Sequence, residues 1–161
     1  MNLTHEVEIY TDGSARGNPG PGGYGVILLW VGKPYKKEIY EGFRRTTNNR
    51  MELLAVIVGL EMLKISNTKV LVVSDSKYVV DSVLKGWVFQ WEKKGYTGKK
   101  NPDLWARFLK IYRKHQVDFK WVKGHNNHPQ NERCDQLAVM ASQSKTLSID
   151  AFYEAESNSN L

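Results

Sequence analysis

Hydrophobic and polar positions alternate near the N-terminus. From residue 7 to residue 10 (VEIY) apolar side chains take every second position, which is the period of a half-buried strand, and the pattern stops at the turn-forming pair Asp12 and Gly13. Residues 24–30 and 35–43 are also rich in strand-forming side chains, and the charges in the second segment favour an edge or exposed strand. The first third of the chain therefore predicts three neighbouring strands.

A different pattern begins after residue 48, where helix-forming segments alternate with short apolar runs. Residues 49–63 are apolar on most sides, which indicates a buried helix, and residues 69–74 (KVLVVS) resemble a strand covered on both faces. The remaining predicted elements are a strand over 117–122 and helices over 76–84, continued by 87–94, over 103–114 and over 129–141. This order predicts an α/β fold with one five-stranded mixed β-sheet flanked by α-helices.

Length and composition set the organisation of the chain. Its 161 residues fit one domain, expected over residues 1–154, with a frayed C-terminal tail over 155–161 (AESNSNL). The single cysteine, Cys134, excludes an internal disulfide. The N-terminus lacks the pattern of a signal peptide, and no apolar run approaches the roughly 20 residues of a membrane span. We therefore expect a cytoplasmic monomer with no membrane partner.

Positive charge is concentrated in one part of the sequence. The net charge is +6, and residues 85–123 hold eleven Lys and Arg against three Asp and Glu, a local balance of +8. The rest of the chain has a balance of −2. This distribution is compatible with one face that binds a polyanion such as nucleic acid, and also with a solvated helical surface.

A glycine-rich stretch matches the spacing of a dinucleotide-binding loop but not its context. Gly20, Gly22 and Gly25 fit G-x-G-x-x-G, yet they lead into the strand-like run GVILLW instead of a helix that could hold a pyrophosphate. Pro19 and Pro21 suit a tight turn. We expect a rigid turn between the first two strands and no nucleotide cofactor.

Four carboxylates occupy positions where a site could form. Asp12 and Asp75 follow predicted strands, at the sheet edge where α/β proteins build their sites, while Glu52 and Asp135 lie on predicted helices. Each also has a local explanation: a turn at Asp12, a capping box of Asn49 with Glu52, a helix cap at Asp75 and a solvated surface at Asp135.

If all four carboxylates meet, these local explanations fail together. Clustered carboxylates repel and raise one another's pKa values, and a hard cation such as Mg²⁺ or Mn²⁺ relieves that repulsion. A metal held by acids on a protein with a basic face implies phosphoryl transfer on a nucleic acid.

Four long segments then resemble the signature blocks of bacterial type 1 ribonuclease H. They are YTDGSARGNPGPGGYGVIL, RTTNNRMELLAVIVGL, VVSDSKYVVDSV and WVKGHNNHPQNERCDQLA, which span roughly residues 7–141 in the family's order. The resemblance implies a single ribonuclease H-like domain. It also implies an endonuclease that hydrolyses the RNA strand of RNA/DNA hybrids and leaves 5′-phosphate and 3′-hydroxyl ends.

The resemblance also implies catalytic roles. Asp12, Glu52, Asp75 and Asp135 match the carboxylates that hold two divalent ions, Mg²⁺ with Mn²⁺ as a substitute; one ion activates water and the other stabilises the leaving 3′ oxygen. His125 matches the catalytic histidine, which can shuttle protons; without the family match it would be interpreted as a surface-loop histidine. The nearby His128 is expected to be structural.

Substrate contacts follow from the same likeness. Gly13, Asn18, Asn48 and Asn49 match positions that contact the hybrid, whose RNA strand is identified by its 2′-hydroxyls, and Thr47 matches a residue that grips a DNA phosphate. Asn48 and Asn49 also suit a simple turn before the helix, and the two roles can coexist.

A basic protrusion of the family matches residues 87–100. Its lysines can bind phosphates and its aromatic rings can pack along sugars, although the spacing of the two tryptophans also suits core packing. We assign Trp105 and Trp121 to the core. The expected contacts in the protrusion are Trp87, Trp91, Lys93, Lys94, Lys99 and Lys100.

The chain departs from the family pattern in a few places. The protrusion is several residues shorter than in the familiar enterobacterial form, Lys77 stands where a glutamine is common, and Ala15 replaces a frequent cysteine. Two other functions stay open at this point: a DNA-cutting nuclease of the same fold, and a hybrid-binding module without activity. Hybrid binding without metal-dependent cleavage would favour the second.

Overall fold

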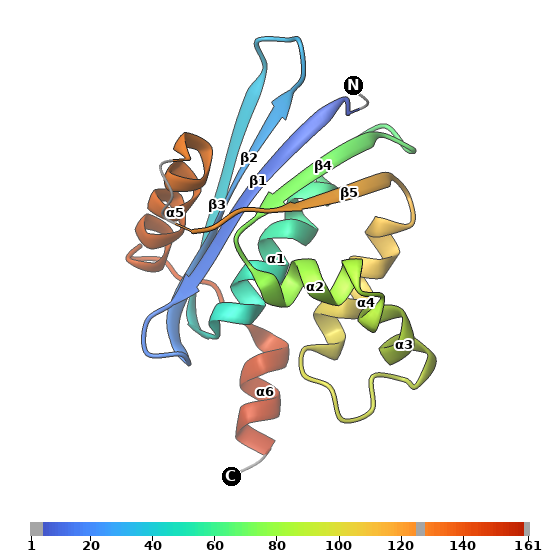
Figure 1. Cartoon of the computed structure of the whole chain (residues 1–161). Helices are drawn as coiled ribbons and strands as arrows, with labels where there is room; N and C mark the ends of the chain where they lie inside the picture. Colours follow the sequence, from blue (N-terminus) through green and yellow to red (C-terminus); the bar gives the residue numbers. More distant parts are fainter. Residues whose placement is uncertain (1–4, 125–127, 160–161) are drawn as a thin grey trace.

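The computed structural model describes residues 5–124 and 128–159 of the chain (Figure 1). The elements, in chain order, are β1 Val7–Ala15, β2 Gly20–Trp30, β3 Lys36–Thr46, α1 Asn48–Glu61, β4 Lys69–Ser74, α2 Lys77–Leu84, α3 Trp87–Lys93, α4 Pro102–Tyr112, β5 Gln116–Trp121, α5 Pro129–Ser142 and α6 Ala151–Ser159. Among the described residues, every helix is too short or too polar to cross a membrane.

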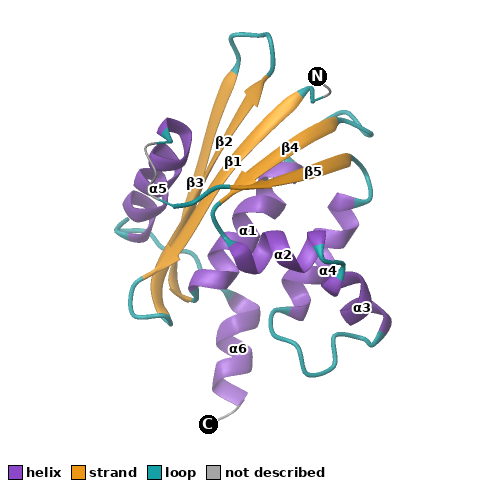
Figure 2. Cartoon of the chain, in the orientation of Figure 1, coloured by secondary structure: helices purple, strands orange, loops and turns teal. Residues whose placement is uncertain are grey.

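The five strands form one mixed sheet in the order β3-β2-β1-β4-β5. The β1–β2 and β2–β3 pairs are antiparallel, and the β1–β4 and β4–β5 pairs are parallel. Helices α1 to α4 gather on one side of the sheet and α5 covers the other (Figure 2). The predicted five-stranded mixed sheet flanked by helices is therefore confirmed.

Two hydrophobic clusters fill the two sides of the sheet. The larger one joins α1 and α4 to inward-facing strand residues such as Ile9 and Val72. The smaller one joins Cys134 and Leu137 of α5 to Tyr10 and other neighbouring strand residues on the opposite face. Strand β1 packs against α1 on one face and α5 on the other, so its middle lies between the two helical layers.

Strand β1 does not stop where the local sequence predicts. It continues through Asp12 and Gly13 to Ala15 and pairs along its whole length with β2, so the predicted turn at Asp12 and Gly13 is wrong. Gly13 packs directly against the backbone of α1, where a Cβ atom would lie 2.7 Å from the Met51 carbonyl oxygen. A glycine is needed here because the helix crosses close to the strand.

The glycine-rich stretch is also part of a strand. Residues from Gly20 onward belong to β2, so the expected rigid turn is confined to the few residues before it. A Cβ atom at Gly23 would lie 2.5 Å from the Ala138 carbonyl oxygen, and one at Gly25 would collide with the Cys134 carbonyl. These glycines allow α5 to approach the sheet.

The C-terminal segment differs from the expected frayed tail. Helix α6 continues through Ala155 to Ser159, and it extends away from the sheet (Figure 1). The Arg44 guanidinium of β3 donates two hydrogen bonds to the Glu154 carboxylate, at 2.7 and 2.8 Å. A tertiary ion pair therefore anchors a helix that the local sequence does not predict.

A buried arginine joins three segments. Arg50, in the first turn of α1, is 3% exposed. Its guanidinium donates two hydrogen bonds to the Asp103 carboxylate of α4, at 2.7 and 2.9 Å, and two to Asp150 just before α6, at 2.6 and 2.9 Å. Thr46 Oγ1 donates to the same Asp150 carboxylate at 2.7 Å. The planar guanidinium matches both carboxylates in a two-pronged geometry, which makes these contacts strong and directional.

We expect Arg50→Ala to lower the free energy of unfolding by about 3–5 kcal/mol, because it leaves two acidic groups without their partner in a buried site. Chemical denaturation measures the change. Arg107→Ala is the matched control: Arg107 pairs in the same two-pronged way with Glu61, again between α4 and α1, but its side chain is 46% exposed. The control should cost about 1 kcal/mol or less. Equal losses in the two variants would contradict the structural role of Arg50.

Candidate active site

Three acidic side chains meet at the centre of the sheet. Asp12, Glu52 and Asp75 each present a carboxylate oxygen, and these three oxygens lie within 4.8 Å of one another. Asp135 of α5 is not part of that group, but its charge contributes to raising the pKa of Asp12. The structure therefore brings three of the four predicted acids together and places the fourth beside them.

The fold explains how residues distant in sequence reach this place. In the parallel β1–β4 pair, Tyr10 lies opposite Val73, so Asp12 and Asp75, each two positions further on, reach the same edge. Glu52 comes from the first turns of α1, which passes over Gly13. The acidic cluster therefore depends on the register of β1 with β4 and on the crossing of α1 over β1 at Gly13.

Local backbone roles do not account for the three acids. Helix α1 is capped by Thr47, whose Oγ1 accepts a hydrogen bond from the Arg50 amide at 3.2 Å, so the predicted capping box of Asn49 and Glu52 is absent. Helix α2 is capped by the Ser76 hydroxyl and not by Asp75. Asp12 lies within a strand rather than in a turn.

Burial and mutual repulsion perturb the ionisation of the cluster. Burial, followed by the charges of Asp75 and Asp135, raises the pKa of Asp12 to about 8. Burial, followed by the charges of Asp12 and Asp75, raises the pKa of Glu52 well above its ordinary value. Three carboxylates with few compensating donors are costly to ionise in a buried site.

The same oxygens suit a metal ion. Glu52 Oε1 and Asp75 Oδ1 are buried, and neither has a hydrogen-bond partner among the described residues. Unpartnered buried oxygens are rare in proteins because they are costly, and carboxylate oxygens are the ligands that hard divalent cations prefer. The donor set therefore fits a divalent metal ion.

The predicted catalytic histidine, His125, lies outside the described residues. Just before it, Gly124 packs against Asp75, where a Cβ atom would lie 2.7 Å from Oδ2. His128 packs on the Tyr10 ring, with the ring centroids 5.5 Å apart. That packing is what we expect of a structural histidine.

The predicted hybrid-contacting asparagines adjoin the start of α1. Asn18 Oδ1 accepts a hydrogen bond from the Asn48 amide at 2.9 Å, and Asn48 Oδ1 accepts one from the Ala15 amide at 2.6 Å. These bonds fix the turn between β1 and β2 against the helix, close to Gly13. The side-chain NH₂ groups of Asn18 and Asn48 make no hydrogen bond to another described residue, and Asn49 is exposed.

The basic protrusion comprises α3 and the residues that connect it to α4. Trp91 packs edge-on against the buried Trp105, at 5.8 Å between ring centroids, so it is partly a core residue. Trp87 is 40% exposed, with Lys85 Nζ 5.3 Å from its ring centroid. The predicted phosphate contacts Lys93, Lys94, Lys99 and Lys100 are all exposed.

One predicted core residue is not in the core. Trp121 is 41% exposed because it ends β5, which is an edge strand of the sheet. Its indole Nε1 donates a hydrogen bond to the Asp75 main-chain oxygen at 3.0 Å, and Lys77 Nζ lies 4.8 Å from its ring centroid. The sequence interpretation missed this residue, although its place at the carboxyl end of the strand beside β4 could have indicated it.

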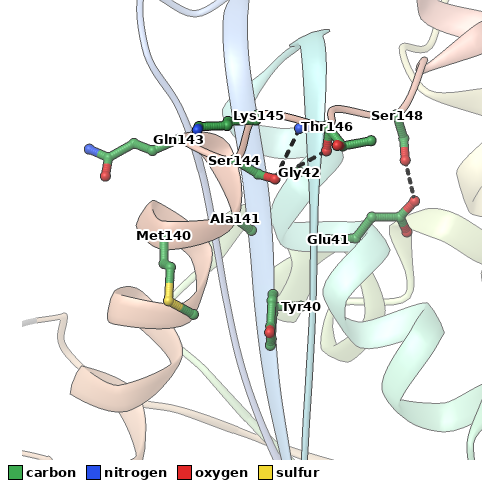
Figure 3. Close-up of a pocket in the computed structure, with 10 residues that line it drawn as sticks. All are labelled: Tyr40, Glu41, Gly42, Met140, Ala141, Gln143, Ser144, Lys145, Thr146 and Ser148. Atoms are coloured by element: carbon green, nitrogen blue, oxygen red, sulfur yellow. Dashed lines mark hydrogen bonds between the residues drawn. The ribbon is translucent and has the colours of Figure 1, made fainter.

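Two cavities lie apart from the acidic cluster. One, of about 600 Å³, lies between β3 and the end of α5, and its wall includes Glu41, which accepts a hydrogen bond from the Ser148 hydroxyl at 2.7 Å (Figure 3). The other, of about 750 Å³, is lined by residues such as Trp30 and Ile65. None of the clustered acids lines either of these two cavities.

The sequence is similar to those of known ribonucleases H. The model of the RNase H family matches residues 4–143. The chain is 54% identical over 150 residues to a ribonuclease H of Desulforamulus reducens, covering 90% of this chain and 92% of that protein. It is 49% identical over 156 residues to a ribonuclease HI of Shewanella oneidensis, covering 94% and 96%.

Solved structures agree with the sequence comparison. LC9-RNase H1, a type 1 RNase H with the type 2 active-site motif, superposes with a TM-score of 0.78 at 31% identity and covers 92% of this chain and 77% of that one. LC11-RNase H1, solved in complex with an RNA/DNA hybrid, superposes with a TM-score of 0.64 at 30% identity, covering 84% and 95%.

The raised pKa of Asp12 predicts how the stability of the metal-free protein depends on pH. Folding raises this pKa from 3.8 to about 8, so the folded state holds the proton more tightly than the unfolded state. The free energy of unfolding should therefore fall as the pH rises from about 4 to about 8 and then level off.

Asp12→Asn should weaken this dependence, part of which remains because the pKa of Glu52 is raised too, and should stabilise the metal-free protein at pH 8 by an amount on the order of a few kcal/mol, with little effect at pH 4. Denaturation in the presence of a chelator at several pH values measures it. Asp81→Asn serves as the control, because it removes from α2 a carboxylate whose Oδ2 lies 3.8 Å from Lys85 Nζ. A destabilised Asp12→Asn protein at pH 8 would contradict the assigned electrostatics.

Proposed function

The chain belongs to the RNase H family, and from this premise we propose that it is an endonuclease that hydrolyses the RNA strand of RNA/DNA hybrids, leaving 5′-phosphate and 3′-hydroxyl ends. The observation that carries the proposal is the cluster of Asp12, Glu52 and Asp75 with its unpartnered buried oxygens. The hybrid bound to LC11-RNase H1, a structural relative, supports the choice of substrate.

The acids would hold the metal. In our proposal Asp12, Glu52, Asp75 and Asp135 bind two divalent ions, Mg²⁺ with Mn²⁺ as a substitute. When bound, the two ions supply activation of the attacking water and stabilisation of the charge on the leaving 3′ oxygen. Because burial and repulsion raise the pKa of Asp12 to about 8, this carboxyl would hold a proton at neutral pH in the metal-free protein and would have to lose it to serve as a metal ligand.

The asparagines beside the cluster would recognise the substrate. Their side-chain oxygens are engaged in fixing the β1–β2 turn, which leaves the NH₂ groups of Asn18 and Asn48 as oriented donors. Together with Asn49 and the backbone at Gly13, these donors suit the 2′-hydroxyls and sugar oxygens that distinguish RNA from DNA. The Thr47 hydroxyl accepts from the helix backbone and keeps its own proton to donate to a phosphate.

The basic protrusion would bind the backbone of the hybrid by charge. Its four exposed lysines can neutralise phosphates, and the half-exposed Trp87 offers a ring to a sugar, whereas Trp91 is partly occupied by core packing. His125 remains the predicted proton shuttle. We further propose that the enzyme acts in the cytoplasm as a monomer.

Cleavage of an end-labelled RNA strand tests the proposal directly. With Mg²⁺ we expect cutting in an RNA/DNA hybrid and none in an RNA duplex or a single strand. Asp12→Asn and Glu52→Gln should lower kcat by more than about 100-fold with hybrid affinity retained, because loss of a metal ligand exceeds the effect of losing a residue that only orients one. Asp81→Asn should cleave at the normal rate. Full activity in Asp12→Asn would overturn the proposed site, and hybrid binding without any cleavage would favour a binding module.

The salt dependence of KM tests the protrusion. Changing Lys93, Lys94, Lys99 and Lys100 together to Gln should raise KM, because the protein then neutralises fewer phosphates of the hybrid. The slope of log affinity against log salt should become shallower by about 0.9 for each phosphate that is no longer neutralised.

The control for that variant changes Lys33, Lys36, Lys37 and Lys64 to Gln, since these lysines lie on other parts of the protein and carry the same total charge. It should leave the slope nearly unchanged. Equal slopes in the two variants would mean that overall charge, and not the protrusion, governs binding.

A further inference from the structure

The main chain at Asp75 is fixed from several directions. The Val122 amide donates a hydrogen bond to the Ser74 carbonyl at 3.0 Å, and the Ser76 amide donates to Ser74 Oγ at 3.0 Å. The Asp75 carbonyl itself accepts from the Trp121 indole at 3.0 Å. Ser74 is thus held by the residue that follows β5, Ser76 by the Ser74 hydroxyl, and the Asp75 carbonyl by the Trp121 side chain.

The Trp121 indole N–H does not need the Asp75 carbonyl as a partner in order to avoid being buried without one. At 41% exposure the indole N–H could be satisfied by water, and the ring also lies 4.8 Å from the Lys77 ammonium. In the β4–β5 register Trp121 is the partner of Ser74, the residue immediately before Asp75. The β4–β5 pairing therefore places the Trp121 indole N–H beside the main-chain carbonyl of Asp75.

Orienting that peptide orients the carboxylate. Asp75 Oδ1 is buried without a partner among the described residues, and Oδ2 lies close to Gly124, where a Cβ atom would be 2.7 Å from it. Residues 121–124 thus approach Asp75 on both its main chain and its side chain. If the peptide rotated, the carboxylate would leave the group that it forms with Asp12 and Glu52.

We propose that Trp121 is a positioning residue for metal binding: its indole N–H holds the Asp75 main chain so that the carboxylate meets Asp12 and Glu52 before any cation arrives. This inference rests on the proposed function, since it concerns the same acidic cluster. Groups that orient metal ligands contribute substantially to affinity because they remove the need for the ligands to rearrange.

The test is Trp121→Phe, which keeps an aromatic ring and removes the donor. Calorimetry with Mg²⁺ and with Mn²⁺ should show binding weakened by about tenfold or more, and kcat should fall with the KM for hybrid unchanged. Trp87→Phe is the matched control, because Trp87 is 40% exposed and also has a lysine over its ring. It should keep the metal affinity of the wild type, and both variants should have similar melting temperatures without metal.

A second variant separates the hydrogen bond from the ring packing. Lys77→Gln removes the cation over Trp121 but keeps the indole donor. It should leave metal affinity unchanged or raise it, because it removes positive charge near the acids. Weakening equal to that of Trp121→Phe would assign the effect to packing of the ring and overturn the proposal.

Three further results separate the role of Trp121 from the proposed function. A wild-type protein that binds metal and cleaves hybrid, with Trp121→Phe indistinguishable from it, would overturn only the role of Trp121. A wild-type protein that binds neither Mg²⁺ nor Mn²⁺ would overturn both. A change in KM with metal affinity unaltered would show that the ring touches the substrate and does not position Asp75.

Discussion

Mutual repulsion among Asp12, Glu52 and Asp75 is the constraint that the rest of the structure has to overcome. Like charges in a buried place favour separation, yet these three oxygens stay within 4.8 Å of one another. Two features of the fold hold them together: the parallel register of β1 with β4, and the close crossing of α1 over Gly13. The hydrophobic clusters on the two faces of the sheet stabilise the fold against this repulsion.

The protein treats two groups of buried charge in opposite ways. Arg50, only two residues before Glu52, is fully matched by the carboxylates of Asp103 and Asp150. This pairing fixes the first turn of α1 at the point from which Glu52 projects. The acidic cluster, by contrast, keeps oxygens that no described residue pairs. The paired Arg50 thus helps to hold Glu52 in an acidic cluster whose donor set fits a divalent cation.

Local patterns predicted some elements better than others. The buried helix α1 and the strand β4 were predictable because their apolar residues are continuous, and the family likeness indicated the four acids. The extension of β1 through Asp12 and Gly13 was not predictable from the sequence. Turn propensity is local, whereas pairing with β2 is a long-range interaction. Helix α6 was missed because its anchors, Arg44 and Arg50, are distant in sequence. Trp121 was assigned to the core on residue type alone, although an edge strand leaves its ring half exposed.

The origin of the acids in separate chain segments has a consequence for folding. Asp12 and Asp75 become neighbours only after β4 pairs with β1, and Glu52 joins them only after α1 docks. A newly made or partly unfolded chain therefore cannot assemble the site, so hydrolytic competence appears only with the native topology. A cation that binds the finished site favours the folded population by mass action, so the divalent-ion concentration around the protein would also set how long each molecule survives proteolysis.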